Sequence, residues 1–156
     1  MESIRWGIIG AGSIADTVAG DFAFVPQAEL VAVASRVPER SRRLARKHGI
    51  PVIHRDYRAL IESDGIDVVH IATTHPHHRD IALAAISAGK AVLVEKAFTV
   101  TLAGTEEVVA AATEAGVFAM EAMWTRFLPA VEAAREVVAW GRIGQVLGVQ
   151  GDLCAF

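Results

Sequence analysis

A carboxylate and an ammonium stand side by side at Glu95 and Lys96, directly after the apolar run 91–94. Such a run is typical of a buried parallel strand, and ligands bind at the edge of a sheet formed by the carboxyl ends of its strands. A lysine at that edge could hydrogen-bond an alcohol oxygen and stabilise negative charge as the hydroxyl proton leaves. The alternative is a surface ion pair, which contributes little to stability.

A second candidate is the pattern Gly-x-Gly-x-x-Ala, which follows the apolar run 6–9. Gly10 permits a tight turn, Gly12 lets a pyrophosphate approach the backbone, and Ala15 lets a helix pack closely on the strand. The free amides and positive dipole end of that helix would then face the phosphates. A lone glycine motif is weak evidence, but a further apolar run at 30–34 lies at the right distance. We therefore expect this turn to contact a dinucleotide through Gly10, Gly12, Ser13, Ile14 and Ala15.

The next strand pattern ends in Ser35 and Arg36, where NAD-specific sites have an acidic residue for the ribose hydroxyls. A hydroxyl and a guanidinium suit a 2′-phosphate instead, through charge-assisted contacts of about 1.5–3 kcal/mol. Arg40 could add a second cation, whereas the three arginines that follow it fit a solvated basic face. The sequence therefore predicts NADP as the cofactor, with NAD as the second choice.

Three histidines lie close together at His75, His77 and His78, after the apolar run 68–72. Clustered imidazoles can bind zinc, but Asp80 is the one acidic or cysteine ligand near them in the sequence. We therefore expect no metal site here. A loop that lines the cofactor is the favoured interpretation, and plain helix capping is the alternative.

Strand and helix patterns alternate along the chain. Strands are expected at residues 4–9, 30–35, 52–54, 68–72, 91–94 and 117–121. Helices are expected between them at residues 14–24, 39–48, 57–63, 79–88 and 102–115. This alternation predicts an α/β fold, a Rossmann-type doubly wound parallel sheet with helices on both faces.

The end of the chain departs from this alternation. A helix is expected at residues 130–140 and a strand at 145–153, and this strand would be the first of a further domain. We therefore expect a dinucleotide-binding domain at residues 1–128, and a linking helix and strand of a second domain at 129–156.

The composition excludes several classes of function. The 156 residues carry a net charge of −3 and are 53% apolar, which gives no electrostatic reason to bind nucleic acid or a membrane. No apolar run reaches the ~18 residues of a membrane span. The single cysteine, Cys154, and the lack of a signal-peptide pattern indicate the cytoplasm.

Four stretches together resemble the N-terminal half of the glucose-fructose oxidoreductase / inositol dehydrogenase / MocA family. They are the glycine turn at 10–15 and the segments 72–78, 88–96 and 121–129. The last is most similar to the branch of dimeric dihydrodiol dehydrogenases and NADP-dependent xylose dehydrogenases. The resemblance implies an NADP-dependent oxidoreductase that transfers hydride between the nicotinamide and a carbinol carbon of a sugar or diol.

The resemblance also implies roles for single residues. Lys96 corresponds to the lysine of the family's Glu-Lys-Pro motif and is the expected catalytic residue, in contact with substrate and nicotinamide. Ala97 replaces the proline of that motif, and Thr74-His75 replaces a common Pro-Asn pair. The residues of these stretches expected at the cofactor are Thr73, Thr74, His75, His78, Glu95, Lys96, Glu121, Trp124 and Arg126.

The resemblance implies a longer, two-domain protein, in which the second domain supplies the general base, the substrate floor and the oligomer interface. We therefore expect a truncated cofactor-binding half of a homo-oligomeric enzyme. The alternative is a non-catalytic module that binds NADP(H) or a partner chain. A purified chain that binds NADPH but oxidises no polyol would favour this alternative.

Overall fold

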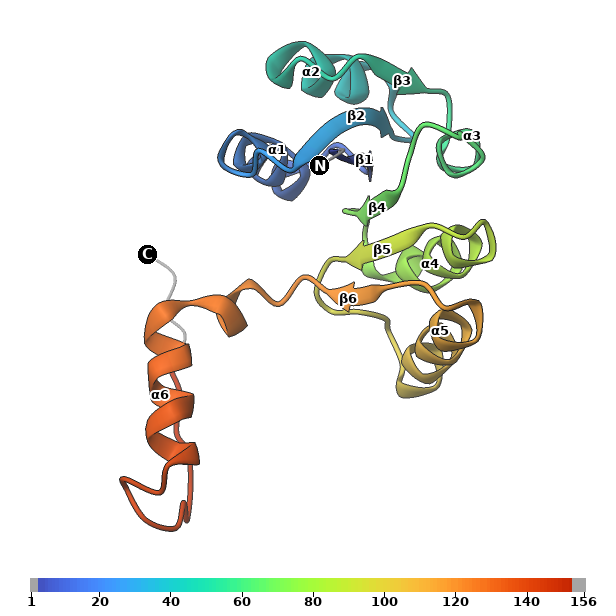
Figure 1. Cartoon of the computed structure of the whole chain (residues 1–156). Coiled ribbons are helices and arrows are strands. Elements are labelled where there is room, and N and C mark those ends of the chain that lie inside the picture. Colours follow the sequence, from blue (N-terminus) through green and yellow to red (C-terminus); the bar gives the residue numbers. More distant parts are fainter. Residues whose placement is uncertain (1–2, 153–156) are drawn as a thin grey trace. The chain divides into compact units, whose positions relative to one another are not determined.

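The computed structural model of the chain describes residues 3–152 (Figure 1). Its strands are β1 (Ile4–Ile9), β2 (Ala28–Ala34), β3 (Val52–His54), β4 (Val68–Ile71), β5 (Ala91–Val94) and β6 (Ala119–Glu121). Its α-helices are α1 (Ser13–Asp21), α2 (Pro38–His48), α3 (Tyr57–Ile61), α4 (His78–Ser87), α5 (Leu102–Ala115) and α6 (Pro129–Ala139). Short 3-10 turns are η1 (Phe22–Phe24), η2 (His75–His77) and η3 (Trp124–Phe127). The chain divides into two compact units, Met1–Ala122 and Met123–Phe156.

The first unit is built on one parallel sheet with the strand order β3-β2-β1-β4-β5-β6. The order reverses between β1 and β4, so the loops that follow these two strands diverge and leave a crevice at the carboxyl edge. The predicted Rossmann-type sheet is therefore confirmed, and the crevice lies beside the glycine turn.

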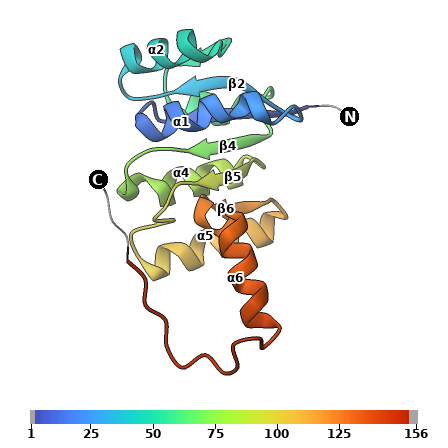
Figure 2. The ribbon, with the colours of Figure 1, turned by 90° about the vertical axis from the view of Figure 1, so that its left-hand side faces the viewer.

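Helices cover both faces of this sheet, and strands β1 and β2 bury apolar side chains on both sides. The core under α1 and α2 includes Ile8, Val33, Ala15, Ala19 and Leu44. The core under α3, α4 and α5 includes Ile71, Val92, Leu60, Ile81 and Val108. Figure 2 looks onto the first of these faces, with α1 in front of the sheet. Successive residues such as Ile8 and Ile9 enter opposite cores, as the two-residue period of a strand requires.

The predicted element bounds differ from the structure mainly at helix ends. The helix expected at 14–24 ends at Asp21, and η1 completes the segment as a tighter turn. Helix α5 begins after Thr101, whose hydroxyl accepts a hydrogen bond from the Gly104 amide at 3.1 Å. Its end at Gly116 has a φ of 64°, a conformation that glycine adopts without strain.

The second unit contains η3 and α6. Helix α6 begins at Pro129, a residue that suits the first turn of a helix because its missing amide would have no partner there. No residue of α6 is buried. The strand expected at 145–153 is wrong over residues 145–152, which form neither helix nor strand, and residue 153 lies outside the described residues. A strand needs a neighbouring strand for its backbone groups, and none pairs with this segment in the described structure.

The division into compact units falls after Ala122. The domain boundary expected after residue 128 stays a prediction. Among the helices of the described residues, none combines the length and the apolar character needed to cross a bilayer.

Candidate cofactor site

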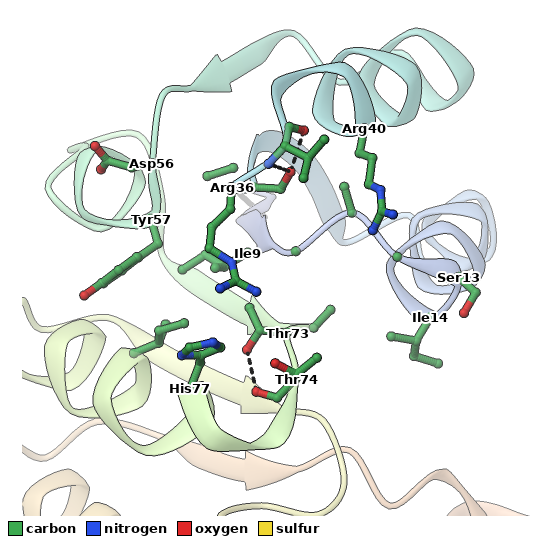
Figure 3. Close-up of a pocket in the computed structure, with 18 of the residues that line it drawn as sticks. Ile9, Ser13, Ile14, Arg36, Arg40, Asp56, Tyr57, Thr73, Thr74 and His77 are labelled. Carbon is green, nitrogen blue, oxygen red and sulfur yellow. Dashed lines mark hydrogen bonds between the residues drawn. The ribbon is translucent and has the colours of Figure 1, made fainter.

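A cavity of about 450 Å³ lies at the carboxyl edge of the sheet, between the segments that follow β1, β2, β3 and β4 (Figure 3). This is the switch point of the strand order, where open α/β sheets bind their ligands. The predicted cofactor residues that line it are Gly10, Gly12, Ser13, Ile14, Ser35, Arg36, Arg40, Thr73 and Thr74. Segments far apart in the sequence therefore meet at one cavity.

The two glycines of the turn have different structural environments. Gly10 has a φ of +114°, and a Cβ there would lie 2.2 Å from the Ala72 carbonyl oxygen. Gly12 precedes α1, and a Cβ there would meet no atom within 4 Å. The open space at Gly12 faces the first turn of α1, whose leading amides have no side-chain cap. Such amides, at the positive end of a helix dipole, form an anion site.

Ala15 belongs to the core rather than to the cavity wall. It is fully buried and packs in the cluster that joins β1, β2, α1 and α2. A small side chain at this position lets α1 lie close to the sheet. Its effect on a ligand is therefore indirect, through the placement of the helix N-terminus.

Two guanidinium groups extend toward the cavity from the segment after β2, as Figure 3 shows for Arg36 and Arg40. Within residues 3–152 neither of them makes a hydrogen bond or an ion pair. Arg42, by contrast, is held by Glu39 at 3.0 Å. Arg36 and Arg40 are thus the cations at this end of the cavity that could receive an anionic ligand.

Ser35 lines the cavity, but its hydroxyl is already engaged. The hydroxyl donates to the Val37 carbonyl at 2.9 Å and accepts from the Val37 amide at 3.2 Å and from the Ser41 hydroxyl at 3.0 Å. A serine hydroxyl has one proton and two lone pairs, so no donor remains for a phosphate. We interpret Ser35 as the residue that shapes the turn from which Arg36 projects.

Sequence reasoning missed several residues of the cavity wall. They are Val37, Asp56, Tyr57, Asp80 and Ile81. Asp56 and Tyr57 come from the start of α3. The sequence after β3 contains no motif that would indicate how close these two residues lie to the glycine turn. Within the histidine segment, the lining residue is His77 rather than His75 or His78.

Lys96 follows β5 at the same edge of the sheet as the glycine turn, because all six strands are parallel. Its side chain is exposed, it does not line the cavity, and its ammonium bonds no group among residues 3–152. The backbone around it is held by side chains. His75 Nε2 lies 3.1 Å from the Lys96 carbonyl oxygen, and Glu121 accepts from the Phe98 amide at 2.8 Å. The peptide between Lys96 and Ala97 is cis.

The alternative interpretation was a surface ion pair between Glu95 and Lys96, but Glu95 pairs with His70 instead. Glu95 is 8% exposed, and its carboxylate lies 3.1 Å from Nε2 of the fully buried His70. The carboxylate therefore turns into the protein while the ammonium remains in solvent. Lys96 is left as the accessible charge at the end of β5.

The three histidines of the predicted loop have separate partners. His77 lines the cavity, His75 contacts the Lys96 carbonyl, and His78 is fully buried between two backbone carbonyls. Nowhere in the described part of the chain do three His, Cys, Asp or Glu side chains gather as they would around a metal ion.

Trp124 and Arg126 lie in η3 of the second unit, and both side chains are exposed. Their expected role at the nicotinamide stays a prediction. His75, His78, Glu95, Lys96 and Glu121 likewise lie outside the cavity wall. The structure gathers these five residues around the end of β5.

Known proteins resemble this chain in sequence and in fold. A family model described as "Oxidoreductase family, NAD-binding Rossmann fold", GFO_IDH_MocA, matches residues 4–123. The trans-1,2-dihydrobenzene-1,2-diol dehydrogenase of Bos taurus is 41% identical over 152 residues, which cover 96% of this chain and 45% of that protein. The chain thus spans less than half the length of this curated relative.

Two solved structures carry different nucleotides. A 3-ketoreductase variant from Actinomadura kijaniata in complex with TDP-benzene and NADP is 30% identical, with a TM-score of 0.84 over 93% of this chain and 45% of its own. The scyllo-inositol dehydrogenase of Lactobacillus casei, with NAD(H) and scyllo-inositol, shares the fold at 24% identity and a TM-score of 0.85, over 92% of this chain and 43% of its own. With the match over residues 4–123, the parallel sheet and its glycine-lined cavity show that the chain belongs to the GFO/IDH/MocA family of oxidoreductases and carries its NAD(P)-binding Rossmann domain.

Proposed function

We propose that this chain binds NADP(H) in the cavity at the switch point, as the cofactor-binding part of a dehydrogenase of sugars or diols. The observation that carries the cofactor choice is the pair of guanidinium groups of Arg36 and Arg40 beside the glycine turn, which have no partner among the residues that the structure describes. The tip of β2 offers no carboxylate that would favour ribose hydroxyls, because Ser35 and Arg36 occupy it.

The residues present fit a dinucleotide. The space beside Gly12 and the uncapped amides of α1 suit a pyrophosphate. Arg36 and Arg40 suit a phosphate on the adenosine ribose, since a guanidinium can bind phosphate through two parallel hydrogen bonds. We expect Ser35 to contribute through the shape of its turn, because its hydroxyl is already satisfied.

A bound nicotinamide would supply a hydride acceptor for oxidation of the carbinol carbon, and the hydroxyl proton would pass to a general base, which the resemblance to the family places in a second domain. The role that we assign to this chain is to place Lys96 at the alcohol oxygen. Its ammonium would donate a hydrogen bond to that oxygen and stabilise the negative charge that develops on it. Its exposed position and the lack of a described partner leave the ammonium available.

A second candidate is a module that binds NADP(H) without turnover. It is favoured by the position of Lys96 outside the cavity wall. Both candidates predict cofactor binding. A purified chain that binds NADPH but oxidises no polyol would support the second candidate.

The decisive experiment compares NADPH and NADH as stabilisers of this chain against heat. A ligand that binds the folded state raises the melting temperature more when its affinity is higher. We expect NADPH to give the larger shift at equal concentration. Equal shifts would contradict the choice of NADP, and no shift with either nucleotide would contradict the cavity assignment.

Arg36→Gln sharpens this test. Loss of a charge-assisted hydrogen bond of about 1.5–3 kcal/mol should weaken NADPH binding roughly 10- to 100-fold and leave NADH binding nearly unchanged. Arg46→Gln, in the last turn of α2 and outside the cavity wall, is the matched control with the same change of charge. If both variants weaken NADPH equally, the effect is one of net charge rather than of a phosphate contact.

A further inference from the structure

A second cavity, of about 360 Å³, lies between α1 and α2 beside the glycine turn, and we call it the interhelical groove. It adjoins the cofactor cavity, since Ala11, Gly12 and Arg40 line both. Beyond these shared residues, the polar residues of its wall are Asp16, Arg43 and Lys47. The site proposed for the dinucleotide therefore borders a region with charges of its own.

The cations of the groove lie on one face of α2. Arg40, Arg43 and Lys47 are three and four residues apart, so successive turns of the helix bring them side by side. Within the described residues of the groove wall, Asp16 of α1 is the one carboxylate set against these three charges. Three cations and one carboxylate leave a formal excess of two positive charges.

The carboxylate of Asp16 is already engaged on the side of Lys47. It accepts a hydrogen bond from Lys47 Nζ at 2.6 Å and lies 2.7 Å from His48 Nε2. The hydrogen bond from Lys47 is the main reason that the pKa of Asp16 lies below its usual value. Asp16 therefore compensates Lys47, whereas Arg40 and Arg43 make no hydrogen bond or ion pair among residues 3–152.

Two guanidinium groups at neighbouring positions of a helix repel each other, and an anion bound between them relieves this repulsion. A phosphate monoester suits such a pair, because its three terminal oxygens accept hydrogen bonds and a guanidinium can donate two of them in parallel. The sequence placed Arg43 on a solvated basic face. The structure leaves it exposed but sets it in the groove wall beside Arg40.

The position of Arg40 indicates which phosphate could reach this pair. Figure 3 shows Arg40 extending toward α1 and Arg36 extending toward Thr73, so the two side chains approach the cavity from different directions. In a fold of this type the pyrophosphate lies at the start of the first helix, and the adenosine ribose lies at the tip of the second strand. A phosphate on that ribose, on the side of Arg40, would stand where the cavity opens into the groove.

We propose that Arg43 is a specificity-determining residue for NADP(H), which binds the ribose 2′-phosphate from the interhelical groove together with Arg40. This inference rests on the proposed function, in which the phosphate is assigned to Arg36 and Arg40. It adds a third guanidinium to that assignment and makes the groove a part of the cofactor site.

The test is a cycle of two side chains and two nucleotides. NADPH and NADH differ by the 2′-phosphate, so the change in the ratio of their dissociation constants on Arg43→Gln isolates the contact between that phosphate and Arg43. We expect NADPH affinity to fall about tenfold, because one charge-assisted hydrogen bond is lost, and NADH affinity to stay nearly unchanged. Fluorescence titration of the purified chain at a fixed salt concentration measures both.

Arg46→Gln is the matched control, because it makes the same change of charge on the same helix and lines neither the cavity nor the groove. Salt gives a second readout, since it screens the attraction between NADPH and exposed cations. NADPH affinity should therefore decline less steeply with salt in Arg43→Gln than in Arg46→Gln. Arg43 is exposed and has no partner among the described residues, so Arg43→Gln should unfold in urea like the wild type.

The outcomes separate this inference from the proposed function. If the wild type prefers NADPH, and Arg36→Gln loses this preference while Arg43→Gln keeps it, the function stands and the inference is overturned. Equal losses of NADPH affinity in Arg43→Gln and Arg46→Gln would also overturn it, because net charge would then explain both. If the wild type binds the two nucleotides equally well, the proposed choice of NADP fails and the inference fails with it.

Discussion

Replacement of each glycine of the turn by alanine should separate what the fold needs from what the ligand needs. At Gly10 an alanine would require a φ of +114°, with its Cβ 2.2 Å from the Ala72 carbonyl oxygen and 2.7 Å from the Ala72 carbonyl carbon. At Gly12 the backbone has a φ of −89°, and the Cβ would meet nothing within 4 Å. The same chemical change thus meets opposite environments two residues apart.

These environments give different expected losses of stability. A left-handed conformation costs an L-residue about 1–2 kcal/mol, and overpacking against atoms that cannot move adds about 1–3 kcal/mol. Gly10→Ala should therefore lower the free energy of unfolding by roughly 2–5 kcal/mol, a large part of the ~5–15 kcal/mol of a typical domain. Gly12 caps α1, where alanine is only modestly worse than glycine, so Gly12→Ala should cost about 0.5–1 kcal/mol.

The expected order reverses for the ligand. The added methyl of Gly12→Ala would stand in the space that we assign to the pyrophosphate. We expect NADPH affinity to fall about tenfold or more, which corresponds to the loss of one charge-assisted hydrogen bond. Urea unfolding measures stability, and NADPH fluorescence titration measures affinity at a fixed salt concentration.

Gly20→Ala is the matched control for both measurements. Gly20 lies in α1 but not in the cavity wall, and a Cβ there would make an ordinary contact with His48 at 3.8 Å. It should be neutral or stabilising by up to ~1 kcal/mol, with unchanged affinity. If Gly12→Ala binds NADPH like the wild type, the space beside Gly12 does not hold the pyrophosphate, and the reasoning fails.

Two further predictions follow from the ends of the strands. In a full-length relative, we expect replacement of the lysine that corresponds to Lys96 by methionine to abolish turnover and to leave cofactor affinity nearly unchanged. If the variant retains most of its kcat, this lysine takes no part in the chemistry. The hydrogen bonds from Arg5 lower the pKa of Asp67 to about 2. The carboxylate of Asp67 therefore stabilises the fold above about pH 4, and this contribution is lost as the pH falls through about 2. Because the side chain is 41% exposed, Asp67→Asn should cost about 1 kcal/mol at pH 7 and little near pH 2 in urea unfolding; a loss that does not change with pH would exclude the ion pair as its cause.

The local sequence contained most of the information about the first unit. Apolar runs such as Ala91–Val94 are typical of strands buried on both faces, and glycines such as Gly116 mark where helices end. The strand expected at 145–153 shows the limit of that reasoning. An alternating pattern describes a strand that could form, but its backbone groups need a neighbour, which a pattern cannot supply.

The sequence alone determined the alternation of elements, the glycine turn, the arginines at the tip of β2 and the lysine after β5, because each depends on residues close together in the chain. Tertiary structure alone decided which side chains share a cavity or a partner. It places Tyr57 and His77 in the cavity wall, turns Glu95 toward His70, and sets His78 between Thr73 and Ala97. The reason is that strand order and crossover geometry bring distant segments to one edge of the sheet, and short-range patterns do not encode those distances.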